Sequence, residues 1–173
     1  MKSITRPEKT EYFEYYDKYV QLVPQGNLLD QFLTVHEQTK KLILSLSEEQ
    51  LNYRYADGKW CIKEILIHLA DAERVFAYRA LRFARKDTTP LSGFDENLYV
   101  PQSKAADRNI TDILREFSSV RKATLELLLS FDDDMFKRSG TANNKEITVR
   151  ALAYILLGHE MHHVNIIKER YLN

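Results

Sequence analysis

The sequence predicts an all-α protein, a four-helix bundle whose helices are joined by long connections. Apolar residues recur at alternating spacings of four and three in several long segments, which is the pattern of helices that bury one face. The chain has only five glycines and four prolines, which is typical of a mostly helical protein. Its 173 residues are enough to bury a core without disulfides, so we expect a single domain spanning residues 1–173.

Residues 1–26 are predicted to form an irregular N-terminal arm that packs through its aromatic side chains and is closed by Pro24 and Gly26. Asn27 is the expected N-cap of the first long helix. His36, beside the buried face of that helix, is expected to face solvent. Ser47 and Gln50 have the spacing of a capping box on a short turn. The buried face of the helix should contain Leu28, Phe32, Val35, Thr39, Leu42 and Leu46.

A second helix is predicted from about Trp60 to Arg85, and His68 lies on its buried side. Glu64 and Asp71 flank His68, either as hydrogen-bond partners of the imidazole or in surface ion pairs with Lys63 and Arg74. Its inward residues should be Cys61, Ile65, Leu69, Ala72, Phe76 and Phe83.

Arg79 shares the face of His68 two to three turns further on. It is expected either to bind an anionic group of a substrate or to extend along the core edge into solvent. A connector over residues 87–108 follows, with roughly twenty structureless residues, and such loops are often functional. Within it, Asp95 and Glu96 could orient a substrate or cap a turn.

The third helix is expected to start at an N-cap of Asn109 or Thr111 and to reach Phe131. Residues 132–147 are polar and predicted to turn at Gly140, after which Thr148 can cap the last helix. Four amphipathic helices with long connections favour a four-helix bundle, and the connections are too long to require an up-down-up-down order.

The last helix carries AYILLGHEMHHVNIIK, residues 153–168, with three of the five histidines. His159 and His163 lie one turn apart on an apolar face and can hold one ion between them. His68 is the candidate third ligand, since bundles build metal sites from inward side chains of facing helices. The alternative is that each is a core histidine, hydrogen-bonded to a carboxylate or a hydroxyl.

Two other metal motifs overlap these residues. His159-Glu160-x-x-His163 matches the HExxH pattern of zinc peptidases, with Glu160 as general base, but only ten residues follow His163 to supply the usual downstream ligand. Glu160-x-x-His163 has the spacing used by di-iron bundles, which need a second such pair and two more inward glutamates. Glu64 and His68 are one residue too far apart to copy it. A single divalent ion is therefore the preferred interpretation.

The chain resembles the DinB-like, or YfiT-like, superfamily of metalloproteins, which includes bacillithiol S-transferases. The resemblance rests on GKWCIKEILIHLADAERVFAYRALRFAR, TPLSGFDENLY and LGHEMHHVNIIKERYL, and covers residues from about 19 to 172. The family pattern falls on Trp60, His68, His159 and His163. The resemblance implies a four-helix bundle of unusual connectivity, often a homodimer, with a divalent ion on the three histidines. His162 adds an imidazole beside the pair, and the one-turn geometry favours His163 as the ligand.

The expected function is that of a metal-dependent enzyme acting on a small molecule, either a thiol S-transferase or a hydrolase. A divalent ion such as zinc, nickel, iron or manganese would activate a low-molecular-weight thiol or a water. No catalytic residue beyond the ligands is assigned. A non-catalytic binding or stress-response module, with a structural metal or none, is the alternative.

Composition excludes several other classes. The 25 basic and 25 acidic residues give a net charge of zero, so neither nucleic acid nor an anionic membrane is an expected partner. The single cysteine, Cys61, excludes an intramolecular disulfide and is typical of a reducing compartment. The polar start lacks the apolar segment of a signal peptide, and no run has the length of a membrane span. We therefore expect a cytoplasmic protein.

Overall fold

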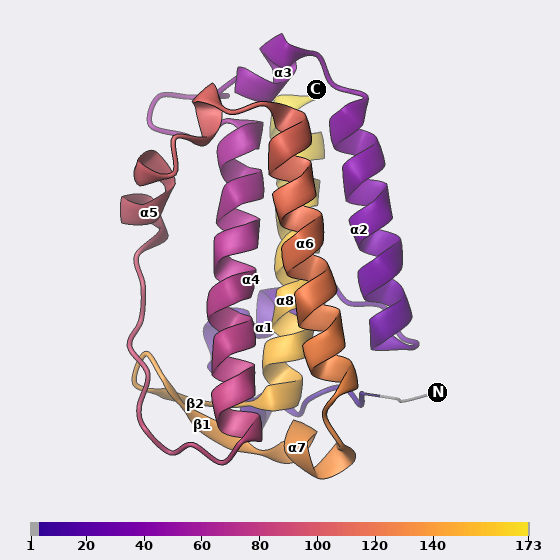
Figure 1. Ribbon diagram of the computed structural model, residues 1–173, viewed down its shortest axis with the longest axis vertical. Helices are drawn as coiled ribbons and strands as arrows, with labels where there is room; N and C mark the ends of the chain where they lie inside the picture. The colour runs from indigo at the N-terminus through magenta and orange to yellow at the C-terminus, as the bar shows by residue number, and fades with distance from the viewer. Residues whose placement is uncertain (1–3, 173) are drawn as a thin grey trace.

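Four long helices lie side by side in the computed structural model, which describes residues 4–172 (Figure 1). They are α2 (Leu28–Leu44), α4 (Ile62–Ala84), α6 (Ile110–Leu129) and α8 (Val149–Ile166). The predicted four-helix bundle is confirmed. The first three residues of the predicted arm, and the last residue of the chain, lie outside the described residues.

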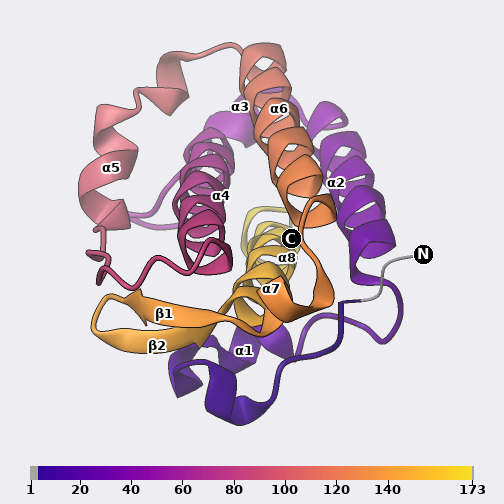
Figure 2. The ribbon, with the colours of Figure 1, turned by 60° about the horizontal axis from the view of Figure 1, so that its bottom comes forward.

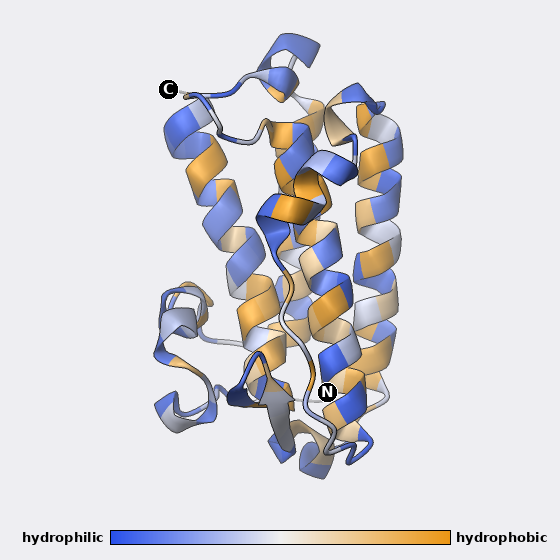
Figure 3. Cartoon of the chain, turned by 90° about the vertical axis from the view of Figure 1, so that its left-hand side faces the viewer, coloured by the Kyte–Doolittle hydropathy of each residue, from blue (hydrophilic) through white to orange (hydrophobic). Residues whose placement is uncertain are grey.

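Each of α2, α4 and α6 buries the face that its spacing predicted. Hydrophilic and hydrophobic residues alternate along the long helices that face the viewer in Figure 3. Helix α8 differs, because every residue from Ala151 to Glu160 is buried. It lies at the centre of the molecule, with α4 and α2 on either side and the N-terminal arm beneath it (Figure 2). A helix that is buried on all sides has no solvent face, so most of its positions are apolar.

Shorter elements join the long helices. The arm forms η1 (Lys9–Glu11), η2 (Glu14–Tyr16) and α1 (Asp17–Val20). The remaining connections hold α3 (Glu48–Asn52), α5 (Glu96–Gln102), η3 (Ala105–Asp107), α7 (Asp133–Lys137), β1 (Ser139–Ala142) and β2 (Lys145–Thr148), and a π-helical turn, η4 (Ile167–Tyr171), extends α8.

Side chains at the predicted caps begin the helices. Asn27 Oδ1 accepts from the backbone N–H of Leu29 at 3.0 Å, and Thr148 Oγ1 accepts from that of Ala151 at 3.2 Å. Asn109, not Thr111, is the N-cap of α6. These caps fix where α2, α6 and α8 start.

Two predicted connections are more ordered than the sequence indicated. The connector 87–108 contains α5 and η3, so it is not structureless. Residues 139–148 form an antiparallel hairpin that turns at Asn143 and Asn144, both with positive φ, and not at Gly140. Gly140 lies inside β1, where a Cβ would come within 2.1 Å of the Phe83 ring. Close packing, not a turn, explains that glycine.

The arm packs on α8 by direct backbone contact. A Cβ on Gly158 would lie 2.0 Å from the Tyr19 carbonyl oxygen, so only glycine allows α1 to approach this closely. Tyr12 and Tyr19 are buried as predicted, whereas Phe13 and Tyr15 are exposed. The approach places Tyr19 beside the histidines of α8.

The expectation that His36 faces solvent is wrong. Its side chain is buried, with Nε2 at 3.0 Å from Ser118 Oγ and its ring 4.7 Å from that of Phe117. The residue lies where α2 meets α6, and burial lowers the pKa of its imidazole to about 4. Across residues 4–172, no helix combines the length and the apolar composition that crossing a bilayer requires.

Candidate metal centre

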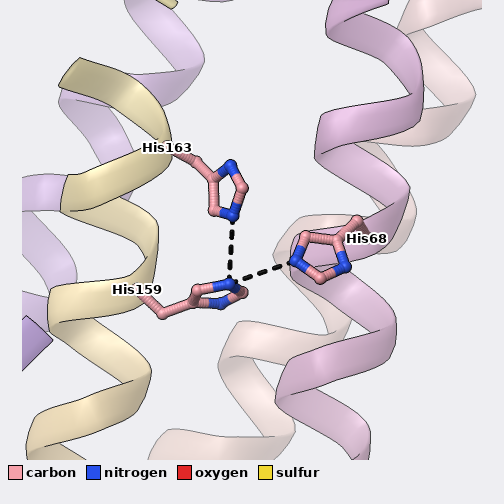
Figure 4. Close-up of side chains that lie close together, drawn as sticks. All are labelled: His68, His159 and His163. Atoms are coloured by element: carbon pink, nitrogen blue, oxygen red, sulfur yellow. Dashed lines mark hydrogen bonds between the residues drawn. The ribbon is translucent and has the colours of Figure 1, made fainter. Parts of the chain in front are cut away.

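Three imidazoles meet between α4 and α8 (Figure 4). His159 Nε2 lies 3.1 Å from His68 Nε2 and 3.1 Å from His163 Nε2, and the three nitrogens all lie within 4.8 Å of one another. His159 and His163 point the same way because four residues make just over one helical turn. His68 reaches them because α4 packs directly against α8. The structure thus brings together the three residues that the sequence singled out.

The three rings are neutral at pH 7. Burial lowers the pKa of His68 to about 4 and that of His163 to about 3, and it lowers the pKa of His159 well below the usual value. Each neutral Nε2 carries either one proton or one lone pair. His159 Nε2 therefore cannot make a good hydrogen bond to both neighbours at once, whichever tautomer it adopts.

A divalent cation suits this arrangement. Two imidazole nitrogens that bind one zinc ion at about 2.0–2.1 Å lie roughly 3.3 Å apart when the geometry is tetrahedral. The two contacts of 3.1 Å are close to that separation. A cation would use all three lone pairs and relieve the hydrogen-bond deficit at His159. Metal ligation by His68, His159 and His163 remains a prediction that the geometry fits.

His162 and Glu160 lie outside this cluster. The His162 ring packs edge to face against Tyr19, with ring centres 5.2 Å apart, and it is His163 that contacts His159. Glu160 leaves α8 about 100° around the helix from His159 and does not line the cavity. It accepts hydrogen bonds from Thr39 at 2.7 Å and Arg121 at 2.7 Å. That direction excludes the peptidase role of Glu160, since a general base must reach the nucleophile at the metal.

The carboxylates flanking His68 act elsewhere. Glu64 accepts a hydrogen bond from the Cys61 backbone N–H at 2.8 Å and forms a two-point ion pair with Arg54. Asp71 pairs with Arg74 at 2.9 Å, which is one of the two roles predicted for it. Neither alternative predicted for Glu64 is right, because it pairs with Arg54 and not with His68 or Lys63, and Lys63 pairs with Glu48.

The three histidines line a cavity of about 530 Å³. The Trp60 ring packs against His68, with ring centres 4.8 Å apart. Asp95 caps α5 by accepting from the Asn97 backbone N–H at 2.9 Å, whereas Glu96 lines the cavity. Cys61 is buried and does not line the cavity. Asp95 therefore has a structural role at the start of α5, whereas Glu96 faces the site.

Sequence reasoning missed part of the cavity wall. The hairpin contributes Asn143 and Lys145, and the arm contributes Tyr16 and Tyr19. The arm was indicated in the sequence by the high density of tyrosines in residues 12–19, which does not show which of these side chains face the cavity. The hairpin residues had no signal, because their place depends on how β1 and β2 fold back over α4.

A second buried cluster was also missed. Arg121 Nη2 donates to Glu160 at 2.7 Å and to Glu73 at 2.8 Å, and all three side chains are buried. Glu73 follows Leu69 by four residues and Arg121 follows Phe117 by four, so both fall on predicted inward faces. Two opposite charges at inward positions of adjacent helices were a usable signal.

Comparison with known proteins agrees with the fold. Two curated proteins, both named "Putative metal-dependent hydrolase", match the chain. The protein from Oceanobacillus iheyensis is 26% identical over 81% of this chain and 81% of its own, and YfiT from Bacillus subtilis is 24% identical over 95% and 88%. The solved structure of YfiT, described as "a probable metal-dependent hydrolase with an unusual four-helix bundle topology", covers 95% of this chain and 90% of its own at 22% identity, with a TM-score of 0.74. The family model of the DinB superfamily matches residues 31–167. The chain therefore belongs to the DinB superfamily.

Proposed function

We propose that this protein is a metal-dependent enzyme that holds one divalent cation on His68, His159 and His163 and acts on a small molecule in the adjoining cavity. One observation carries the proposal: three neutral imidazole nitrogens converge on the wall of a 530 Å³ cavity. The names of the curated relatives favour hydrolysis.

A cation held by three imidazoles keeps positions open for a water or a thiol and lowers the pKa of whichever binds there. The chain supplies the rest of the site. The Trp60 and Tyr19 rings pack against His68 and His159 and restrict their rotation. Together with the neighbouring Tyr16 and Phe76, these rings form an aromatic wall beside the histidines.

Thiol transfer is the second candidate. The cavity is large enough for a small thiol and an electrophile together, whereas hydrolysis needs one organic substrate. The thiol would have to come from solution, because Cys61 is buried away from the cavity and burial raises the pKa of its thiol.

Metal analysis of protein purified without a polyhistidine tag tests the site. The wild-type chain should carry about one equivalent of zinc, nickel, iron or manganese. His68→Ala and His163→Ala should carry almost none while keeping their helix content. His162→Ala is the matched control, since it removes an imidazole that also lines the cavity, and it should keep the metal. If His68→Ala and His163→Ala both keep a full equivalent, the ligand assignment is wrong.

Activity separates the two chemistries. The metal-loaded protein should hydrolyse small amides or esters without added thiol, or conjugate a fluorogenic electrophile only when a thiol such as cysteine or glutathione is present. Either activity should disappear in His163→Ala. A metal-loaded protein that is inactive in both screens would favour the non-catalytic binding module.

A further inference from the structure

The cavity contains a buried cation at the end opposite the histidines. Arg79 is 4% exposed and lines the cavity wall. It follows His68 by eleven residues of α4, which is close to three full turns, so both side chains leave the same face of the helix. At 1.5 Å per residue their Cα atoms are roughly 16 Å apart along the helix axis.

The guanidinium of Arg79 has few partners. Its Nη2 donates to the Ser92 carbonyl oxygen at 3.0 Å, and its Cζ lies 5.2 Å from the Phe76 ring centre and 6.0 Å from that of Phe94. Among residues 4–172 it forms no ion pair with a carboxylate. Glu96 and Glu146, the two carboxylates that line the cavity, are therefore not its counterions.

A buried guanidinium without a counterion is costly, because the hydrogen bond to Ser92 and the two ring contacts replace only part of its hydration. Arginine stays protonated even when burial lowers its pKa, as it does here. A ligand carboxylate would replace the lost hydration and could accept two hydrogen bonds from the planar fork. The flanking Phe76 and Phe94 rings offer an apolar surface beside that position.

We propose that Arg79 binds the carboxylate of an elongated amphipathic substrate whose reactive group lies at the histidines. This inference rests on the proposed function for the reactive end, and on the cavity and Arg79 for the anionic end. Such a site selects substrates with one carboxylate, an aromatic or aliphatic body, and a reacting bond well separated from the carboxylate.

The test compares 4-phenylbutyrate with its neutral analogue 4-phenylbutanamide by nuclear magnetic resonance titration of the full chain as purified. The wild-type protein should bind the carboxylate about tenfold more tightly than the amide, since hydrogen bonds to charged groups are the stronger ones. Arg79→Gln should reduce this ratio to about one, and Arg79→Lys should keep part of it, because lysine retains the charge and loses the fork.

Arg74→Gln is the matched control, because it makes the same charge change on α4 at a residue outside the cavity lining. It should keep the wild-type ratio. His163→Ala tests whether the carboxylate binds a metal instead, and it should also keep the ratio. If Arg79→Gln keeps the ratio and His163→Ala abolishes it, the carboxylate binds at the histidines and the proposal is wrong.

The two proposals fail separately. A metal-loaded wild-type protein with no preference for the carboxylate contradicts the role of Arg79 and leaves the metal site standing. A protein that binds no metal but shows the Arg79-dependent preference contradicts the proposed function and supports the anion position. Circular dichroism of Arg79→Gln, compared with wild type, establishes that a lost preference does not reflect unfolding.

Discussion

Arg121 lies between two buried carboxylates, Glu73 and Glu160, and replacing it with methionine should strongly destabilise the protein. Its Nη2 lies 2.8 Å from Glu73 and 2.7 Å from Glu160, and the three side chains are at most 3% exposed. Methionine has a similar length and no charge. The variant would leave two carboxylates in the core without a cation. Removing one partner of a buried ion pair usually costs about 3–5 kcal/mol of unfolding free energy.

The loss of unfolding free energy in Arg121→Met should depend on pH. Burial already raises the pKa of Glu73 and of Glu160, although Arg121 opposes the shift. A carboxylate with a raised folded pKa stabilises the fold below its unfolded pKa, and this stability is lost as the pH rises through the folded pKa. Without Arg121 both values rise further, so the loss is larger at pH 8 than at pH 5. Each pKa unit corresponds to about 1.4 kcal/mol of free energy. The loss of unfolding free energy can therefore differ between pH 5 and pH 8 by at most about 4 kcal/mol per carboxylate.

Urea unfolding at pH 5 and pH 8 measures both quantities. Arg115→Met is the matched control, since Arg115 is also on α6 but 75% of its side chain is exposed and it pairs with Asp112. That change should cost less than about 1 kcal/mol at either pH. Adding Glu160→Gln to Arg121→Met should recover part of the loss at pH 8. An equal cost for Arg121→Met at both pH values would refute the reasoning, because an uncompensated buried carboxylate must respond to protonation.

Three further predictions concern the site and its surroundings. Gly158→Ala should destabilise the protein by about 1–3 kcal/mol and displace Tyr19, because the new Cβ would meet the Tyr19 carbonyl oxygen at 2.0 Å. Thermal unfolding measures the loss of stability, and the nuclear magnetic resonance signals of Tyr19 report its displacement. An unchanged melting temperature with unchanged Tyr19 signals would contradict this prediction. The pKa of His68 is lowered to about 4 in the folded protein, so its imidazole takes up a proton in the unfolded chain first as the pH falls. The unfolding free energy of metal-free protein should therefore drop by roughly 2 kcal/mol between pH 7 and pH 5. His68→Gln should lose less over the same range, and an equal loss would contradict the lowered pKa of His68. Asp95→Ala should raise amide exchange within α5 by removing a cap worth about 0.5–2 kcal/mol, with α6 unaffected; unchanged exchange in α5 would argue against the cap.

The sequence predicted the long helices because each of α2, α4 and α6 buries one face, and a buried face leaves a repeating apolar pattern. The caps were predictable for a local reason, since the Asn27 and Thr148 side chains bond to N–H groups two or three residues away. The hairpin was missed because its strands have four residues each, too few for a pattern. The α5 helix was missed because its seven residues include Pro101.

The histidine cluster was predictable for a different reason. His159 and His163 are adjacent by helix geometry alone, and His68 joined them through its inward position and the resemblance to the family. For the Arg121 cluster, the sequence indicates only that Glu73 and Arg121 fall on inward faces, because its three charges come from α4, α6 and α8. Which charge meets which depends on the packing of those helices.

The two clusters are joined through helix α8. His159 and Glu160 are consecutive residues, so their side chains leave the helix about 100° apart. One therefore faces the cavity while the other faces Thr39 and Arg121 in the core. An α8 rotated about its axis would break the ion pair of Glu160 and turn His159 away from His68 together. The buried ion pair thus acts together with the apolar packing of residues 151–157 to hold the orientation that the three imidazoles need, and Glu160 contributes to it without contacting the site.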